Sequence, residues 1–310
     1  MQTHSVDMKF DDSDSWAILS EIEKSIKSKV DAVGTPLKDW DIQINFGIKT
    51  GFNDAFIIDS QTKDEILSKC TSAYERVRTT EIIRPILRGR DIKRYSYQYA
   101  GLYLISTFPA KGYDIDDYPA VKDYLLKFGI ERLEQTGKEH IINGERVKAR
   151  KKTSNKWYET QDSISYWDLL SQPKIIWGEI SDKSKFCIDL HGRYVPEATT
   201  FMLSGENLIY LLAFLNCSVS EYLFSIIGTT TGVGTVRWKK YKILELPVPK
   251  SIPNDLYSQL LEVCSQTIES SDNDSNESKI NSIIYQVYGL SEDEIEFIES
   301  RIYPSKHSSL

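Results

Sequence analysis

The first part of the chain carries apolar residues at helical spacing. They recur every three or four residues after a stretch rich in serine and aspartate, which can cap a helix. The pattern predicts an amphipathic helix over residues 16–30, and Gly34 and Pro36 favour a turn after it. The apolar positions are Trp16, Leu19, Ile22, Ile26 and Val30.

Short runs rich in β-branched and aromatic residues follow, and they alternate irregularly with further helical patterns. A doubly wound sheet would need a strict order of strand, helix and strand, so the pattern predicts an α+β fold with a mixed sheet. The predicted strands are residues 42–48, 55–59, 101–107, 174–180, 185–190 and 198–204. The further predicted helices are residues 63–70, 120–134, 207–227, 255–270, 278–288 and 292–301.

Two of these later segments bear on the architecture. Residues 207–227 are almost wholly apolar, which predicts one long core helix, and their Cys217, Ser218 and Glu221 argue against a membrane span. The acidic, low-complexity residues 271–276 predict a linker that separates the main body from a final pair of helices.

Composition narrows the class of protein. With 40% hydrophobic residues in 310, the chain can bury a substantial core. It has no apolar run of about 18 residues, and its polar start does not resemble a signal peptide, so we expect a cytoplasmic protein without a membrane partner. The scattered cysteines and histidines favour free thiols over disulfides or a zinc site. The cysteines are Cys70, Cys187, Cys217 and Cys264.

Charge is distributed unevenly along the chain. The net charge is −7, but residues 251–310 hold eleven acidic residues against three basic ones, so residues 1–250 are close to neutral. An acidic total therefore does not exclude a nucleic-acid ligand for the first 250 residues.

The motifs of a complete catalytic centre are not recognisable. An adenine-N6 methyltransferase loop needs Asn or Asp before Pro-Pro and an aromatic residue, and the nearest sequence is Pro247-Val248-Pro249. Neither Gly47 with Gly51 nor residues 228–234 spell a dinucleotide or phosphate loop. Asp91-Ile92-Lys93 has the minimal spacing of a nuclease centre, which charged chains often contain by chance. We therefore assign no catalytic and no metal-binding residue.

Basic residues gather in three clusters with aromatic neighbours, over residues 76–94, 132–156 and 237–242. Arginine forks can bond base edges, whereas lysines mainly neutralise phosphates, so the first cluster is interpreted as a reader of bases and the second as a clamp on the DNA backbone. The alternatives are solvated faces, or arginines packed against core carboxylates. The candidates are Arg84, Arg88, Arg90, Lys93 and Arg94; Lys148, Arg150, Lys151 and Lys152; and Arg237, Lys239 and Lys240.

Several ordered segments resemble a known family. LKDWDIQINFGIKTGFNDAFIID (37–59) and EIIRPILRGRDIKRYSYQYAGLYLI (81–105) are similar to the TaqI-type C-terminal specificity domain of type II, in particular type IIG, restriction-modification enzymes, which join an adenine-N6 methyltransferase to a nuclease. The similarity continues to about residue 300. The further segments are YPAVKDYL (118–125), KWYETQ (156–161), YWDLLSQPKIIWGEIS (166–181), YLLAFLNCSVSEYLF (210–224), VRWKKYKILELPVP (236–249) and INSIIYQVYGLSEDEIEFIES (280–300).

The resemblance implies a module that recognises double-stranded DNA and lacks the catalytic domain. It implies no cofactor in this chain, and S-adenosylmethionine in an adenine-N6 methyltransferase domain or subunit; the chain would be an excised domain or a separate subunit, and whether it is itself an enzyme stays open. The expected organisation is a helical lead-in (1–34), a DNA target-recognition domain (35–250) and an acidic helical segment (251–310). The alternatives are a divergent catalytic fragment and a protein-interaction module.

The resemblance also gives a reason for two glycine-containing motifs. Gly47 and Gly51 would let the backbone turn sharply near DNA, which adds Lys49 and Asn53 to the candidates. Asp91 is expected to orient Arg90 or Arg94 by a charge-assisted hydrogen bond. The acidic tail is expected either to dock on a basic protein surface or to repel non-specific DNA.

Overall fold

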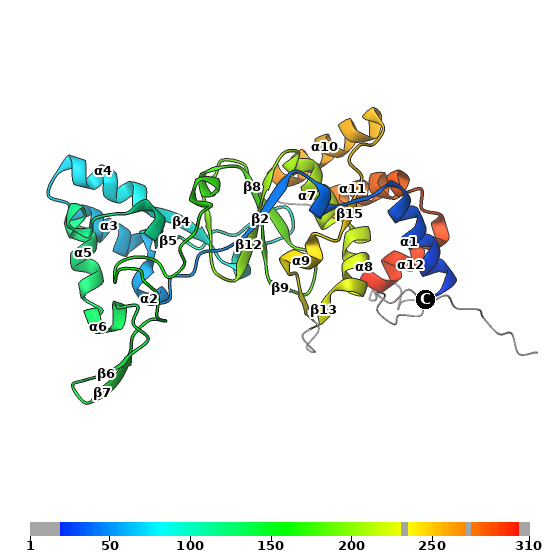
Figure 1. The fold of residues 1–310 in the computed structure, drawn as a ribbon. Coiled ribbons are helices and arrows are strands. Elements are labelled where there is room, and N and C mark those ends of the chain that lie inside the picture. Colours follow the sequence, from blue (N-terminus) through cyan, green and yellow to red (C-terminus); the bar gives the residue numbers. More distant parts are fainter. Residues whose placement is uncertain (1–18, 231–234, 271–273, 304–310) are drawn as a thin grey trace, which may run out of the picture.

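The computed structural model describes residues 19–230, 235–270 and 274–303, which form an elongated molecule (Figure 1). A sheet in its middle has the strand order β10-β8-β12-β2, with every neighbouring pair antiparallel. A second sheet, β11-β4-β5-β3, is mixed, because β11 and β4 pair in parallel. The strands are β10 (Phe186–Asp189), β8 (Lys174–Gly178), β12 (Thr200–Gly205), β2 (Ile42–Phe46), β11 (Val195–Pro196), β4 (Ile83–Leu87), β5 (Leu102–Ile105) and β3 (Ile57–Asp59).

Smaller ribbons and helices surround these sheets. Together they confirm the predicted α+β class with a mixed sheet. The small strands are β1 (Thr35–Pro36) with β15 (Pro247–Val248), β6 (Glu139–Ile142) with β7 (Glu145–Lys148), and β13 (Thr229–Thr230), β14 (Val236–Arg237) and β9 (Ile180–Ser181). The α-helices are α1 (Glu21–Val33), α2 (Asn53–Phe56), α3 (Ser60–Ser68), α4 (Ala73–Ile82), α5 (Pro119–Leu126), α6 (Ile130–Leu133), α7 (Leu208–Asn216), α8 (Ser218–Ile227), α9 (Lys240–Ile243), α10 (Asn254–Glu269), α11 (Asp274–Tyr288) and α12 (Glu292–Ile302).

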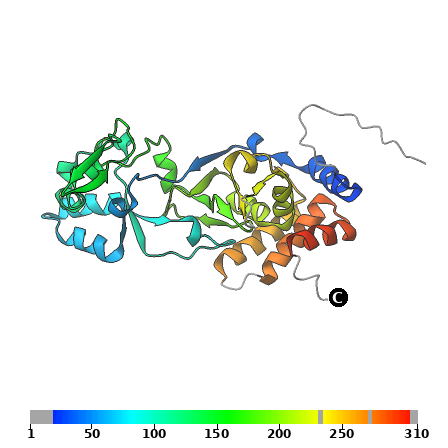
Figure 2. The ribbon, with the colours of Figure 1, turned by 90° about the horizontal axis from the view of Figure 1, so that it is seen from below.

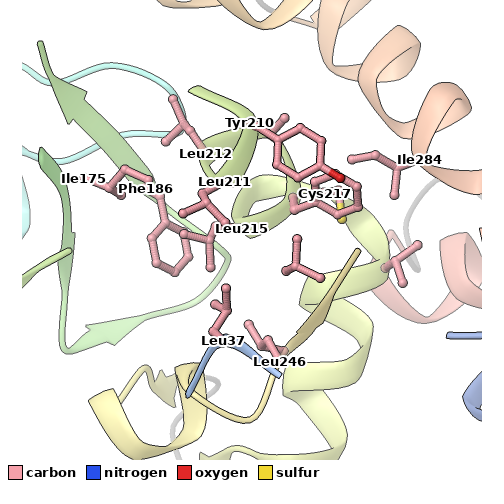
Figure 3. Close-up of a cluster of buried hydrophobic side chains, with 14 of the residues drawn as sticks. Leu37, Ile175, Phe186, Tyr210, Leu211, Leu212, Leu215, Cys217, Leu246 and Ile284 are labelled. Carbon is pink, nitrogen blue, oxygen red and sulfur yellow. The ribbon is translucent and has the colours of Figure 1, made fainter. Parts of the chain in front are cut away.

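In the β10-β8-β12-β2 sheet, strands β10, β8 and β12 are buried on both faces and lie between two hydrophobic cores. Ile175 and Trp177 of β8 pack into one core, and Ile176 between them packs into the other, as the twofold alternation of a strand requires. This explains why the segment is a continuous apolar run. The first core also contains α7, α8 and the C-terminal helices (Figures 2 and 3), and the second contains β3–β5 and α5.

The prediction of one long core helix over residues 207–227 is wrong. The helix breaks at Cys217, whose backbone is extended, and α7 and α8 meet at 65°. The Asn216 side chain pairs with both backbone groups of Phe186, and the Cys217 sulfur accepts the N–H of Ser220, so both residues serve the break. No single helix among the described residues is long and apolar enough to cross a membrane; only this bent pair passes that test.

The predicted separation of the last two helices from the main body is also wrong. Residues 271–273 lie outside the described part, but α11 begins at Asp274, and Ile280 and Ile284 of α11 are fully buried in the first core. Ile26 of α1 packs in the same core. Hydrophobic contacts therefore cross both predicted segment boundaries, at residues 34 and 250. The division into three segments itself stays a prediction.

Other boundaries shift for local reasons. The opening helix begins at Glu21, because Ser20 and Glu23 form a reciprocal capping box there, while residues 16–18 lie outside the described part. The helix predicted over residues 120–134 divides into α5 and α6 at Gly129, which has a φ of +79° that side chains disfavour.

A buried carboxylate joins α12 to α1 and makes stability depend on pH. Glu294 accepts hydrogen bonds from Lys29, Ser25 and the backbone N–H of Ser291, each at 2.7 Å. Burial alone would raise its pKa, but these bonds lower the pKa of Glu294 from 4.5 to about 2. The contribution of Glu294 to the free energy of unfolding is therefore present above about pH 4.5 and lost as pH falls towards 2.

We expect Glu294→Gln to remove that dependence. Between pH 6 and pH 3, the free energy of unfolding should fall by about 2 kcal/mol more in the wild type than in the variant. Urea unfolding at the two pH values measures this difference. Asp293→Asn, in the exposed part of the same turn, is the control and should keep the wild-type drop. An equal drop in Glu294→Gln and the wild type would contradict the assignment.

Candidate nucleic-acid interface

The chain turns sharply after β2, as the glycine spacing predicted. A side chain at Gly47 would place its Cβ 1.8 Å from the carbonyl oxygen of Glu197, so only glycine allows this approach. Gly51 adopts a φ of +75°. The turn leaves Lys49 and Asn53 exposed. The Thr50 hydroxyl donates to Asn53 Oδ1 at 2.6 Å, so the amide nitrogen of Asn53 is the donor available to a ligand.

Arg150 holds this turn from inside the protein. Arg150 is 1% exposed, and its guanidinium donates to four main-chain carbonyls, including that of Thr50 at 2.8 Å. The other acceptors are the carbonyls of Leu133, Glu159 and Trp157, at 2.7, 2.7 and 2.6 Å. Burial, with a further effect of Arg132, lowers the pKa of Arg150 to about 10, so the group stays charged at neutral pH. The prediction that Arg150 holds the DNA backbone is therefore corrected, since its donors are used within the fold.

Two adjacent hollows of about 410 and 530 Å³ lie beside the turn and share Lys49 and Gln161. Arg132 lines the first hollow, lies 4.0 Å over the ring of Phe52 and donates to the Lys148 carbonyl. The hollow thus presents hydrogen-bond donors with different chemistry, suited to phosphate oxygens and base edges. The other polar residues lining the first hollow are Thr50, Asn53, Asp54 and Glu197, and those lining the second are Thr153, Ser154, Asn155, Asp162, Ser163 and Tyr166.

In the first basic cluster, Asp91 orients Arg88. The Arg88 fork donates to both carboxylate oxygens of Asp91, at 2.7 and 3.0 Å, and the Arg88 N–H donates to the same group. Burial raises the pKa of Asp91, but these bonds hold it below its ordinary value. The prediction that Asp91 orients Arg90 or Arg94 is therefore wrong. Arg90 and Lys93 are exposed, and no ion pair to either occurs among the described residues.

Two arginines of this cluster are turned into the fold. Arg84 donates to the carbonyls of Leu170 and Gly192. Arg94 lies between Glu221 and Glu277, at 3.0 and 2.8 Å, and also bonds Ser184. Both are corrected from DNA-reading candidates to structural residues, because their guanidinium groups bond carbonyls or carboxylates within the fold. Glu277 belongs to the acidic C-terminal segment. Its ion pair with Arg94 docks this part of the segment on a basic residue of the main body.

The remaining candidates divide by exposure. Lys148, Lys151 and Lys152 are exposed, whereas Lys239 and Lys240 are half-buried. Arg237 pairs with Glu179 at 3.0 Å. Its neighbour Trp238 is buried, stacked on Phe224 with ring centroids 4.0 Å apart.

The turn at residues 197–199 connects the Gly47–Asn53 turn with the first and third basic clusters. Ile48 bridges to Glu197, and the Glu197 N–H donates to the carbonyl of Leu87, next to Arg88. The Glu179 N–H donates to the carbonyl of Thr199. Because Glu179 also pairs with Arg237, the turn is connected to the third basic cluster as well. We call residues 47–53, 88–90, 197–199 and 237 the loop junction. The elements α2, β9, β13 and the β6–β7 hairpin all lie towards the lower side of Figure 1.

Arg132 and Gln161 were not among the candidate residues. Arg132 lies inside the second basic cluster, so its charge was a signal that could have identified it. The candidates from this cluster came instead from its densest part. Gln161 carries no such signal. The contact between its N–H and the Lys49 carbonyl, from more than a hundred residues away, places it in the hollow.

Comparisons with known proteins agree on one family. The sequence model of the TaqI-like C-terminal specificity domain matches residues 84–248, more than half of the chain. The type II methyltransferase M.BstVI of Geobacillus stearothermophilus is 25% identical over 310 residues, which cover 97% of this chain and 49% of that protein. The type II methyltransferase M.PaeR7I of Pseudomonas aeruginosa is 22% identical, over 90% of this chain and 44% of that protein. The chain thus spans about half the length of these relatives.

A solved structure shares the fold. The type IIL restriction-modification enzyme MmeI, determined in complex with DNA, superposes with a TM-score of 0.51 at 12% identity, over 89% of this chain and 37% of that one.

Proposed function

Because the chain belongs to the TaqI-like C-terminal specificity domain family, we propose that it selects the double-stranded DNA sequence at which a type II restriction-modification adenine-N6 methyltransferase acts. The family is that of specificity domains in restriction-modification methyltransferases. What this chain itself binds, and which base its partner methylates, are parts of the proposal.

The loop junction is the observation that carries the proposal. It joins an exposed lysine and an exposed asparagine, Lys49 and Asn53, to an arginine whose fork is held by Asp91. Oriented forks and amides distinguish bases in the major groove, whereas mobile lysines only neutralise phosphates. The junction holds both kinds of group.

The methyl-transfer chemistry belongs, in this proposal, to a methyltransferase domain or subunit that binds S-adenosylmethionine. Two features support that division. The sequence has no Asn/Asp-Pro-Pro-aromatic loop and no glycine-rich cofactor turn. The polar groups that line the two hollows also suit phosphate and base contacts better than a buried cofactor, because both hollows are open.

We expect Arg90→Ala to relax the preference for one base pair. Arg90 is exposed and follows Gly89, so its removal should leave the fold intact but cost about 1–3 kcal/mol of binding free energy on the preferred duplex. Selection from a randomised duplex library, with the wild type and then the variant, measures both effects.

Lys151→Ala/Lys152→Ala is the matched comparison. It should weaken all sequences alike and reduce the slope of log K against log salt by about two. If the wild type enriches no motif, the proposed function is wrong. If the lysine variant changes base preference and Arg90→Ala weakens every duplex equally, the two roles are reversed.

A further inference from the structure

A two-stranded ribbon projects from the body beside the first hollow. Its strands β6 and β7 pair in antiparallel register, and a two-residue turn joins them. Both turn residues, Asn143 and Gly144, have positive φ, at 52° and 84°. This is the tight turn whose twist matches a hairpin, so the sequence specifies the ribbon locally.

One face of the ribbon is completely exposed. Ile141 and Arg146 lie directly opposite each other, and their exposed fractions are 78% and 83%. The next pair on that face, Glu139 and Lys148, is exposed as well. An isolated two-stranded ribbon is marginally stable in water, and this one leaves an apolar side chain, Ile141, available to a ligand on its exposed face.

The base of the ribbon is fixed to the Gly47–Asn53 turn. Hydrogen bonds continue the ladder past β7, from Ala149 N–H to the Lys138 carbonyl and from Gly137 N–H to the Arg150 carbonyl. Arg150 is the buried residue that bonds Thr50, and Arg132 bonds the Lys148 carbonyl. The direction of the ribbon is therefore set by the same groups that shape the first hollow. Figure 1 shows the β6–β7 hairpin extending away from the body on that side.

Charge and width identify the ligand. Apart from the buried Arg150, residues 137–152 contain five basic residues and two acidic ones, so the ribbon and its base attract a polyanion. The major groove of B-form DNA is wide enough to admit a two-stranded ribbon. An apolar side chain beside an arginine matches the two kinds of group there, thymine methyls and guanine acceptors.

We propose that the β6–β7 hairpin enters the major groove, where Ile141 and Arg146 contact base edges. Lys148 at its base, with Lys151 and Lys152, then lies against phosphates. This inference rests on the proposed function and deepens it: part of the cluster interpreted as a clamp on the DNA backbone is a second reader of bases.

The test uses the full chain and the duplex selected by the wild type, with a scrambled duplex of equal length. Ile141→Ala/Arg146→Ala should weaken binding to the selected duplex about tenfold or more, and to the scrambled duplex less than about threefold. The control, Val77→Ala/Lys69→Ala, removes one exposed apolar group and one positive charge near α4. It should change neither affinity by more than about twofold.

A second measurement identifies the groove. Replacing thymine by deoxyuridine and guanine by 7-deazaguanine removes groups from the major-groove edge only. The wild type should lose affinity for this duplex, and the hairpin variant should lose at least about fivefold less, because its contacts are already gone.

The outcomes separate the two proposals. A wild type that does not distinguish the selected from the scrambled duplex overturns the proposed function. A discriminating wild type with an equally discriminating hairpin variant overturns the hairpin proposal alone. Equal loss on both duplexes also overturns it, because it would assign the hairpin to the DNA backbone.

Discussion

Arg150→Leu is expected to lower the free energy of unfolding by about 3–5 kcal/mol and to weaken DNA binding as well. Leucine fills part of the volume but donates no hydrogen bond, so the carbonyls of Thr50, Leu133, Trp157 and Glu159 lose a shared donor. Each buried acceptor left unsatisfied costs about 1–3 kcal/mol, and local rearrangement recovers part of that. Binding weakens because the Gly47–Asn53 turn loses its internal support.

The neighbouring residue supplies the matched control. Lys151 is exposed, so Lys151→Leu should change the free energy of unfolding by less than about 0.5 kcal/mol. It should instead reduce the salt slope of DNA binding by about one. Urea unfolding and titration with a duplex at several salt concentrations measure both. If Arg150→Leu matches the wild type in unfolding and changes only the salt slope, Arg150 contacts DNA after all.

The sequence predicted the fold to the extent that local patterns determine it. Runs of β-branched residues located all four strands of the β10-β8-β12-β2 sheet, but only β3 and β5 of the second sheet. Helical periodicity located α10 and α12 to within one residue at most ends. The break between α7 and α8 could not be predicted in the same way. Cys217 and Asn216 look like tolerable members of an apolar helix until Phe186, thirty residues earlier, pairs with Asn216.

The candidate site shows the same limit more clearly. Charge clusters predicted where basic residues gather, but not which of them point inward. Arg94 meets a carboxylate 127 residues away and another 183 residues away, and Arg150 meets a carbonyl 100 residues away. Neither pairing leaves a local pattern in the sequence. The DNA-binding roles of the exposed lysines and of Asn53 stay predictions.

Arg94→Met is the second change for which we expect a large effect. It should lower the free energy of unfolding by about 3–5 kcal/mol. The substitution leaves Glu221 and Glu277 partly or wholly buried without their shared cation. Arg94 also connects α8 to α11, so the variant should loosen the attachment of the C-terminal helices. No change of base preference should follow, because the guanidinium is turned into the protein.

The pH dependence of that loss separates an ion pair from simple packing. Burial already raises the pKa of Glu277 although Arg94 opposes it, so removing Arg94 should raise the pKa further. A carboxyl with a raised folded-state pKa favours folding at low pH and loses that contribution as pH rises. Arg94→Met should therefore be less destabilised at pH 5 than at pH 7.5, relative to the wild type. Arg94→Met/Glu277→Gln should recover part of the loss at pH 7.5 and show a weaker pH effect. Wild-type stability in Arg94→Met, together with a changed motif in duplex selection, would instead return Arg94 to the residues that read DNA.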